Sequence, residues 1–226
     1  MADKVSKKRK REIMGEIVSR LEEYYPEATC ALEYSGEPWK LLVMGRLSAQ
    51  CTDARVNIVC GELFSVYPTY EALADGDLED IERIIRPCGL FRTKAASIKA
   101  ACTMLRDEYG GRLPDTMDEL LRFPGVGRKI ANLLLGDIYK KPAIVADTHC
   151  IRICGRFGMY PETLKDPNRV EKIMSELIAS EKSSDFCHRI VNFGREVCSA
   201  RSPKCDECPL CDLCAHGKNI QKFKKQ

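Results

Sequence analysis

The 226-residue sequence has no apolar run that approaches the roughly 20 residues needed for a membrane-spanning helix. Its basic first residues, 1–11, are followed by no apolar stretch and no cleavage site, so a secretory signal is not expected. Long alternating runs, strand–helix–strand spacing and internal repeats are also missing. We therefore expect a cytoplasmic protein that does not bind membranes and is built from helices.

A strong excess of one charge is missing as well. The chain has 36 Lys and Arg residues against 33 Asp and Glu residues, which leaves a net charge of +3. Any basic surface for nucleic acid must therefore be local. The hydrophobic fraction of 44% is high enough to build a core and excludes disorder of the whole chain.

Apolar residues recur at helical spacing along most of the chain. Thr116 followed by Glu119 predicts a capping box, and Asp166-Pro167 predicts another helix start. The single segment expected to be extended is Ala143–Ala146. The sequence predicts an all-α fold of about ten helices with a loop-rich C-terminal part. The clearest helical repeats lie in these segments: Ile13–Leu21, Val56–Leu63 and Ile98–Tyr109.

Cysteine is unusually frequent, with 13 residues in the chain. Because disulfide frameworks belong to short secreted chains, a metal or redox cofactor is favoured over disulfides, and over free structural thiols. Four thiolates around one centre suit zinc or an iron–sulfur cluster. Spacing alone does not decide the metal, nor whether Cys198 or Cys211 is the fourth ligand. Five cysteines fall in the last 29 residues: Cys198, Cys205, Cys208, Cys211 and Cys214.

The segment Leu121–Ala131 predicts two helices joined by a Pro-Gly-x-Gly turn. Glycines allow positive φ and a close approach of the backbone to a ligand. The first amides of the second helix carry partial positive charge and suit a phosphate, which fixes register without reading sequence. An ordinary helical hairpin turn is the structural alternative.

Lys129 lies in the first turn of that second helix, and Asp147 follows 18 residues later at the start of another helix. Each residue has a purely structural interpretation, because Lys129 can be a solvated lysine and Asp147 an N-cap. The two roles of Asp147 are compatible, since a cap at the edge of a cleft can present its carboxylate to a substrate.

Four motifs in order resemble the endonuclease III family of DNA glycosylases: residues 47–53 (LSAQCTD), 123–135 (FPGVGRKIANLLL), 145–149 (VADTH) and the cysteine-rich C-terminal loop. The similarity runs from about Ile13 to Cys214. It implies two helical lobes with a DNA-binding cleft between them. One is a six-helix barrel with the helix-hairpin-helix, over 31–141. The other joins 1–30 and 142–226 and holds the metal centre.

The resemblance implies a base-excision repair enzyme that removes oxidised pyrimidines of the thymine glycol type from duplex DNA. Its partner would be double-stranded DNA with damaged bases or abasic sites, and we expect it to act as a monomer. Lys129 would attack the sugar C1′ and form a Schiff base, and β-elimination would then cut the strand. Asp147 would stabilise the positive charge that develops on the sugar. A lysine at position 129 separates the chain from the adenine-mismatch branch, and the cysteine loop separates it from the oxoguanine branch.

The same resemblance implies a [4Fe–4S] cluster and leaves Cys211 as a spare thiol. Arg201 and Lys204 lie between Cys198 and Cys205 and would contact phosphates. Ser202 stands where another basic residue is expected. The cluster would shape and position this loop and take no part in hydrolysis. The ligands implied are Cys198, Cys205, Cys208 and Cys214.

The resemblance also assigns the contacts to a flipped nucleotide. Gln50 would fill the space that the base leaves, and Leu90 would wedge into the opposite strand, although Leu90 could also be a core residue. Gly125, Gly127 and Arg128 of the hairpin would bind the DNA backbone.

One feature departs from these expectations. Gly45-Arg46 interrupts an apolar helix over 41–47, so Arg46 would either pair internally or reach the base pocket. The basic tract Lys7–Arg11 could touch DNA, but a solvated helix start is favoured. The competing function is a non-catalytic, zinc-capped DNA-binding module, which would not explain why Lys129 and Asp147 match the enzyme motifs.

Overall fold

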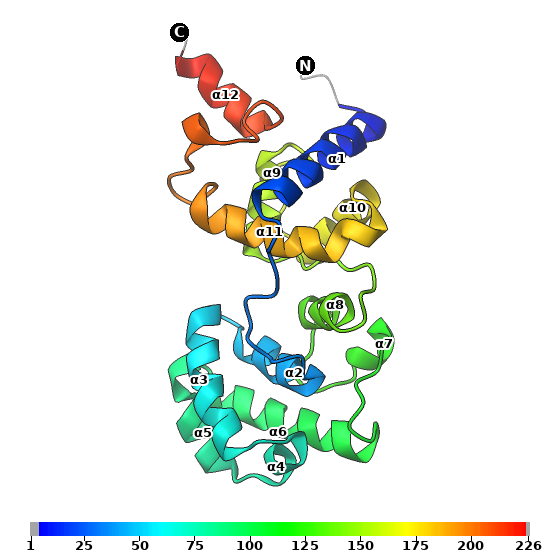
Figure 1. The fold of residues 1–226 in the computed structure, drawn as a ribbon, viewed down its shortest axis with the longest axis vertical. Helices are drawn as coiled ribbons and strands as arrows, with labels where there is room; N and C mark the ends of the chain where they lie inside the picture. Colours follow the sequence, from blue (N-terminus) through cyan, green and yellow to red (C-terminus); the bar gives the residue numbers. More distant parts are fainter. Residues whose placement is uncertain (1–4, 225–226) are drawn as a thin grey trace. The chain divides into compact units, whose positions relative to one another are not determined.

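The computed structural model describes residues 5–224, with side chains through Asn219. Over these residues it contains twelve α-helices, three short 3₁₀ helices and no β-strand, which confirms the all-α prediction (Figure 1). No helix in this range is both long and apolar enough to cross a membrane. The chain forms two compact units. One is Cys30–Lys140, and the other combines the residues up to Thr29 with those from Lys141 onward.

The unit Cys30–Lys140 is a packed set of helices around an aliphatic core. Helix α6 lies at its centre and packs against α4, α5 and α2, while α8 packs against α2 and α7 (Figure 1). The elements are α2 (Pro38–Leu47), α3 (Asp53–Val66), α4 (Tyr70–Asp75), α5 (Leu78–Ile85), η1 (Arg86–Cys88), α6 (Phe91–Asp107), α7 (Met117–Leu120) and α8 (Arg128–Asp137).

Helix α2 is not interrupted at Gly45-Arg46, so that expectation was wrong. Gly45 is buried and permits the close packing of α2 on α8, because a Cβ placed there would lie 3.2 Å from Ile130 Cγ2. The Arg46 Nε donates a hydrogen bond to Ser97 Oγ at 2.7 Å. The sequence left two roles open for Arg46, pairing internally or reaching the base pocket. The bond to Ser97 is the internal pairing.

The second unit buries its apolar side chains between four helices. Helix α11 packs against α9 and α1, and α1 also packs against α10 (Figure 1). Met14, Ile153, Phe186 and Phe193 are fully buried in this core. The elements are α1 (Lys7–Tyr24), α9 (Thr148–Arg156), α10 (Pro167–Leu177), η2 (Ser180–Lys182), α11 (Ser183–Glu196), η3 (Cys205–Glu207) and α12 (Ala215–Lys224).

The segment Ala143–Ala146 has no regular secondary structure, and α11 supplies its hydrogen-bond partners. Ala143 N donates to Ser183 Oγ at 3.0 Å, and Val145 N donates to Cys187 Sγ at 3.2 Å. The segment is largely buried, so these side-chain acceptors replace the neighbouring strand that a sheet would provide.

The helix-start signals in the sequence are confirmed. Thr116 Oγ1 accepts from Glu119 N at 3.4 Å, which is the N-cap half of the predicted capping box. The Glu119 carboxylate accepts from the Thr116 hydroxyl at 2.7 Å, where a capping box has it accept from the backbone N–H. Asp166 caps α10 by accepting from Arg169 N at 2.7 Å. The estimate of about ten helices was low, because a helix as short as the six-residue α4 has too few turns to show a periodicity.

The basic tract Lys7–Arg11 opens α1, as expected, but it is not simply solvated. Lys7 Nζ pairs with Glu176 Oε2 at 2.6 Å, Lys10 Nζ donates to Met159 O at 2.7 Å, and Arg11 Nε donates to Glu176 O at 2.8 Å. These contacts fasten α1 within its own unit. The periodicity of one helix does not reveal them, because the partners are about 150 or more residues away in the chain.

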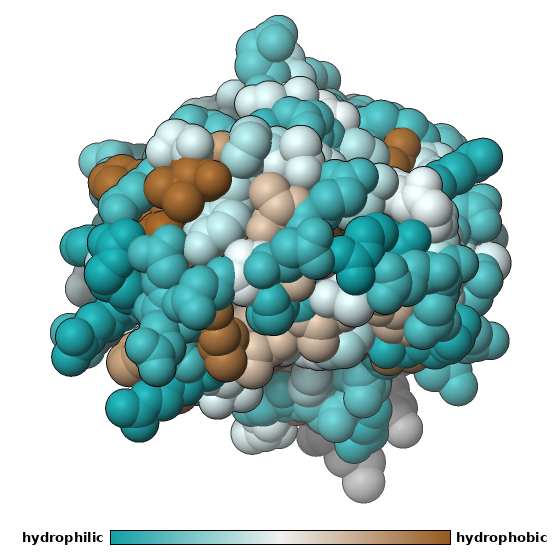
Figure 2. All heavy atoms as spheres, turned by 90° about the horizontal axis from the view of Figure 1, so that it is seen from below, coloured by the Kyte–Doolittle hydropathy of each residue, from teal (hydrophilic) through white to brown (hydrophobic). Residues whose placement is uncertain are grey.

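The face of the molecule in Figure 2 is largely hydrophilic, with a few small separate hydrophobic patches. Exposed large apolar side chains are few over the described residues, and the most exposed are Ile58 and Leu90, at 74% and 58%. Isolated apolar residues are normal on a protein surface. The exposure of Leu90 answers one question from the sequence, because this side chain is not part of the core.

Candidate active site

The turn between α7 and α8 has the hairpin geometry that the sequence predicts. Phe123 N donates to Leu120 O at 3.2 Å, and Val126 N donates to Phe123 O at 3.0 Å. The buried side chains of Phe123 and Val126 anchor the turn in the core. Gly125 lies between them at a φ of +79°, a conformation that L-residues rarely adopt.

The start of α8 offers backbone donors to an anion. Its first intrahelical bond runs from Ala131 N to Gly127 O at 3.0 Å, so the amides before Ala131 have no acceptor within their own helix. Gly127 is the N-cap and has no side chain to cap those amides. A Cβ at Gly127 would meet nothing within 4 Å, so the backbone there is open to a close approach. This arrangement can bind one phosphate group.

Arg46 lies directly beneath the hairpin. A Cβ at Gly125 would lie 2.5 Å from Arg46 Nε and 2.8 Å from its Cδ. Because Arg46 Nε is held by Ser97 Oγ, the guanidinium has a fixed place against the turn. Only glycine at position 125 leaves room for this contact.

Lys129 and Asp147 occupy helix starts in different units. Lys129 is exposed in the first turn of α8, directly after the hairpin. Asp147 is the N-cap of α9, and its Oδ1 accepts from Cys150 N at 2.7 Å. The predicted capping role of Asp147 is therefore present. Its second carboxylate oxygen is not needed for the cap, so capping does not prevent a second role.

Gln50 and Leu90 are both exposed and both have a left-handed backbone. Gln50 has a φ of 55° in the turn between α2 and α3, and Leu90 has a φ of 50° at the N-cap of α6. Gly89, next to Leu90, has a φ of 69°. Non-glycine residues in this region are uncommon and tend to occur where the surroundings hold them for a functional reason.

The cysteine loop, defined here as residues 197–214, follows α11 and contains only the short helix η3. Lys204 N donates to Val197 O at 3.0 Å, which closes residues 198–203 into a compact subloop. Arg201, Ser202 and Lys204 are exposed on it. The two basic side chains are therefore available to a ligand in solution.

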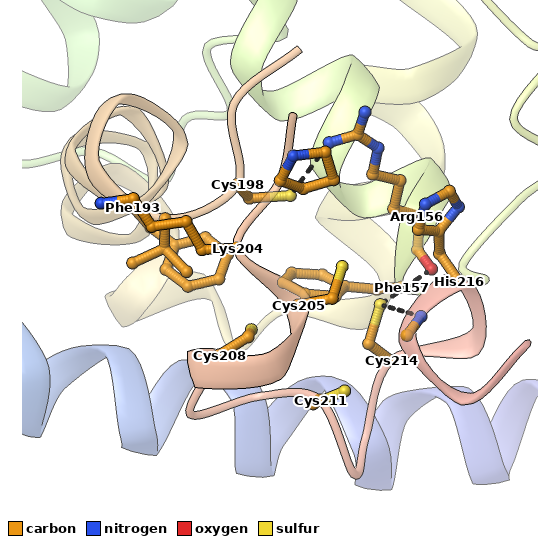
Figure 3. Close-up of a pocket in the computed structure, with 13 residues that line it drawn as sticks. Arg156, Phe157, Phe193, Cys198, Lys204, Cys205, Cys208, Cys211, Cys214 and His216 are labelled. Atoms are coloured by element: carbon orange, nitrogen blue, oxygen red, sulfur yellow. Dashed lines mark hydrogen bonds between the residues drawn. The ribbon is translucent and has the colours of Figure 1, made fainter. Parts of the chain in front are cut away.

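All five C-terminal cysteines line one pocket (Figure 3). Burial raises the pKa of Cys208 to about 11 and raises the pKa values of Cys205 and Cys214 above the ordinary value. For these three residues, burial thus favours the protonated thiol unless a metal displaces the proton. Among the residues with described side chains, no three His, Cys, Asp or Glu residues are arranged to hold a single metal ion.

Arg156 of α9 is the main polar partner of this pocket (Figure 3). It is buried, its Nη1 donates to Cys198 Sγ at 3.2 Å and to Ser199 O at 2.7 Å, and its Nη2 donates to Ala200 O at 2.9 Å. Gly217 N also donates to Cys214 Sγ at 3.4 Å. Soft sulfurs with a buried cation and N–H donors beside them are the kind of donor set that a thiolate-bound metal centre uses, so the chemistry of the residues fits such a centre.

Comparison with known proteins agrees with these features. The sequence model of HhH-GPD superfamily base excision DNA repair proteins matches residues 43–180. Endonuclease III of Synechocystis sp. is 44% identical over 206 residues, which cover 91% of this chain and 93% of that protein. The chain belongs to the endonuclease III family. Endonuclease III of Escherichia coli K12 is 35% identical over 205 residues, covering 91% and 96% of the two chains.

Solved structures of endonuclease III have the same fold. A trapped endonuclease III–DNA covalent intermediate and a non-covalent endonuclease III–DNA complex each match with a TM-score of 0.87 and 38% sequence identity. They cover 96% and 97% of this chain and 100% of the solved chains. A thermostable thymine-DNA glycosylase shares the fold with a TM-score of 0.83 at 22% identity. As an endonuclease III family member, the protein is a base-excision repair enzyme, a DNA glycosylase with AP lyase activity.

Sequence reasoning did not single out Arg156 or the buried Lys94. Both carry a signal that is visible afterwards, because each is a charged residue at an apolar position of a helical stripe. Arg156 is three residues after Ile153, and Lys94 is four residues before Ile98. Only the fold shows which carbonyls and sulfurs these side chains bind.

Proposed function

We propose that Lys129 is the nucleophile and Asp147 its charge partner in the glycosylase and lyase reactions of this protein. The protein is a bifunctional base-excision repair glycosylase for oxidised pyrimidines. The observation that carries the assignment is the place of Lys129, an exposed amine in the first turn of α8, directly behind the hairpin. A phosphate held by the hairpin would bring the neighbouring sugar to this amine.

DNA binding would rest on groups that do not read sequence. The first amides of α8, the open backbone at Gly127 and the side chain of Arg128 would bind one strand. Arg201 and Lys204 on the cysteine loop would bind phosphates elsewhere on the duplex, and their exposure supports this role. Ser202 offers no charge, so we expect the contact at this loop to be weaker than with a third basic residue.

The damaged base must leave the stack, because the glycosidic carbon is shielded inside duplex DNA. Gln50 would occupy the space that the base vacates, and Leu90 would insert on the opposite strand. Their exposed side chains and left-handed backbones support these roles. A polar amide suits the hydrogen-bonding edge of an unpaired base, and an apolar side chain suits the space between stacked bases.

The chemistry would begin when the neutral amine of Lys129 attacks C1′. A C–N bond to the lysine forms, the glycosidic bond breaks, and the departing base takes up a proton. The sugar ring opens as the Schiff base forms. Loss of the C2′ proton then expels the 3′ phosphate by β-elimination. The carboxylate oxygen of Asp147 that is not used for capping would stabilise the positive charge on the sugar.

Cys198, Cys205, Cys208 and Cys214 would hold a [4Fe–4S] cluster, whose chemistry here is structural. The donor set of soft sulfurs beside Arg156 supports this assignment. Cys211 would remain a thiol, and its sulfur already packs closely on Gly217 of α12, where a Cβ would lie 2.8 Å away. Arg156 would hold the subloop of Arg201 and Lys204 in place by its bonds to Ser199 and Ala200.

The two lobes would then divide the work. The residues 31–141 would form the barrel that carries the hairpin and the nucleophile. The residues 1–30 and 142–226 would carry Asp147 and the cluster. DNA with damaged bases or abasic sites would bind to both lobes.

Borohydride trapping on a duplex with one thymine glycol tests the proposal. The expected result is a covalent protein–DNA adduct that is absent with Lys129→Gln and present with Lys165→Gln, which removes another exposed lysine. Undamaged and oxoguanine duplexes should give little adduct. An adduct that persists in Lys129→Gln would overturn the assignment of the nucleophile.

A visible charge-transfer absorption of the purified protein tests the metal. A brown protein with about four iron atoms per chain is expected for the cluster. A colourless protein that contains zinc and binds DNA without trapping would instead support the non-catalytic DNA-binding module.

A further inference from the structure

Lys94 is a fully buried lysine that binds three backbone carbonyls. It lies in the first turn of α6, and its side chain has no exposed surface. Its Nζ donates to Leu47 O at 2.8 Å, to Ala49 O at 2.7 Å and to Cys88 O at 2.9 Å. An ammonium group has three N–H donors, so every donor of Lys94 is used.

These carbonyls come from two separate loops. Leu47 and Ala49 lead directly into Gln50, whereas Cys88 comes two residues before Leu90. The backbone amide of Lys94 also donates to Leu90 O at 3.0 Å. A single residue thus binds both the Gln50 loop and the Leu90 loop, defined here as residues 47–51 and 86–91.

The two loops also touch each other at this point. Cys51 and Cys88, one from each loop, are neighbours, close enough for the Cys51 thiol to act on the Cys88 thiol. Burial and then the neighbouring Cys51 thiol raise the pKa of Cys88 to about 11, so Cys88 is a neutral thiol here. The Gln50 and Leu90 loops therefore lie side by side, both bound to Lys94, although about 40 residues separate them in the chain.

Burying an ammonium group costs free energy that an apolar side chain in the same space would not cost. Removal from water disfavours the charge and lowers the pKa of Lys94. An apolar side chain of similar length would fill the same volume without that cost, but it would leave two buried carbonyls and one part-buried carbonyl without this donor. What the ammonium adds is the orientation of those carbonyls, and hence of the left-handed residues Gln50 and Leu90 that follow them.

We propose that Lys94 is a positioning residue that holds the Gln50 and Leu90 loops in one register, so that both side chains enter the DNA together. This inference rests on the roles proposed above for Gln50 and Leu90. Lys94 touches neither substrate nor the reacting atoms. It acts by making the two insertions a single event, because neither loop can shift without breaking bonds to the same ammonium group.

The test compares a substrate that needs base extrusion with one that does not. Lys94→Met keeps the length of the side chain and removes the donors. Excision of thymine glycol from duplex DNA should fall on the order of 10- to 100-fold, because the inserting side chains lose their alignment. Cleavage at an abasic site in single-stranded DNA needs no extrusion and should change by less than about threefold. Equal losses on both substrates, or no loss on either, would overturn the proposal.

Lys99→Met is the matched control. Lys99 lies on the same helix, and its Nζ donates to Ala74 O at 2.8 Å and to Gly76 O at 2.6 Å, away from both loops. This variant removes the same kind of bond from the same helix. It should leave the ratio of the two activities unchanged. A change in that ratio as large as the one in Lys94→Met would show that any weakening of α6 has this effect, and would overturn the specific role of Lys94.

Gln50→Ala and Leu90→Ala test the insertion roles of Gln50 and Leu90 separately from the positioning role of Lys94. Each should lose thymine glycol excision selectively, and adding Lys94→Met to either should cost less than in the wild-type protein, because the residues act together. If neither variant loses excision selectively, the roles proposed for Gln50 and Leu90 fail. If both lose it and Lys94→Met does not, only the positioning role fails.

A measurement on the unaltered protein covers the case in which Lys94→Met does not fold. Amide hydrogen exchange should show one common opening rate for segments 47–51 and 86–91. Lys94→Arg keeps a cation with several donors and should recover part of the selective loss. Independent exchange of the two segments would overturn the proposal.

Discussion

The hairpin and the cysteine loop are both irregular segments that carry functional residues, but they are held in different ways. The hairpin uses backbone bonds between neighbours, Phe123 N to Leu120 O and Val126 N to Phe123 O. The cysteine loop is fastened from a distance. Arg156 of α9 binds Cys198, Ser199 and Ala200, and Arg20 of α1 binds Pro209 O and Asp212.

The difference follows from what each segment must present. The hairpin presents backbone amides, whose positions are fixed once the local φ and ψ angles are fixed. The cysteine loop presents side-chain sulfurs and basic groups, and a loop without regular structure needs outside partners to hold them. Local changes should therefore damage the hairpin, whereas the loss of distant partners should damage the cysteine loop.

The largest effect should come from removing one of the proposed cluster ligands. Cys205→Ser should lose iron and leave segment 198–214 unprotected in hydrogen exchange, while the helices of Cys30–Lys140 keep their protection. Cys211→Ser is the control in the same loop and should keep the iron. Equal loss of iron from both variants would contradict the choice of ligands.

Arg156→Met should have the next largest effect. It leaves Cys198 Sγ and the part-buried carbonyls of Ser199 and Ala200 without their donors, which should lower the free energy of unfolding by about 3 kcal/mol. Denaturant unfolding of the protein gives this value. The same change at the exposed Arg169 of α10 should be close to neutral. A cost below that of the Arg169 variant would show that the loop does not depend on its distant partner.

Substitutions at two glycines test the backbone of the hairpin. Gly125→Ala should lower stability by about 2 kcal/mol, because the positive φ disfavours a side chain and the Cβ would meet Arg46. A Cβ at Gly127 would meet nothing within 4 Å, so Gly127→Ala should lower the free energy of unfolding by about 1 kcal/mol or less. It should nevertheless weaken binding to duplex DNA, since the methyl group takes the place of an approaching phosphate. Thermal unfolding and a fluorescence binding titration distinguish the two effects, and unchanged DNA affinity in Gly127→Ala would argue against phosphate binding there.

The smallest effect concerns pH. The hydrogen bond from Arg20 holds the pKa of Asp212 below its ordinary value of 3.8. A carboxyl whose pKa is lowered in the folded state stabilises the fold above 3.8 and loses that contribution as the pH falls through the lower, folded value. Asp212→Asn should therefore weaken the fall in melting temperature below pH 4 and change little at pH 7, because the pair is exposed. An equally steep acid transition in the variant would show that this contact does not contribute.

The sequence predicted the local features well. The N-cap at Thr116, the start at Asp166-Pro167 and the cap at Asp147 need only neighbouring residues, and all three are present. The Pro-Gly-x-Gly turn is equally local. The family itself follows from short motifs in order, which the comparisons confirm.

Sequence patterns did not predict the hydrogen-bond partners that are distant in the chain. The basic tract at the start of α1 was expected to be solvated, yet Lys7, Lys10 and Arg11 all bind residues more than 140 positions away. Arg46 was expected to break a helix, but the helix continues because its guanidinium finds Ser97 and the space beside Gly125. A charged residue inside an apolar stripe signals that a buried partner exists, but not which one.

The sequence by itself thus determined the helices, their caps, the hairpin and the cysteine spacing, since each depends on residues a few positions apart. The tertiary structure alone decided which distant carbonyls Lys94 and Arg156 bind and how the Gln50 and Leu90 loops meet. The physical reason is that a buried charge must find its hydrogen-bond partners wherever the packed chain places them, and that placement is a property of the whole fold.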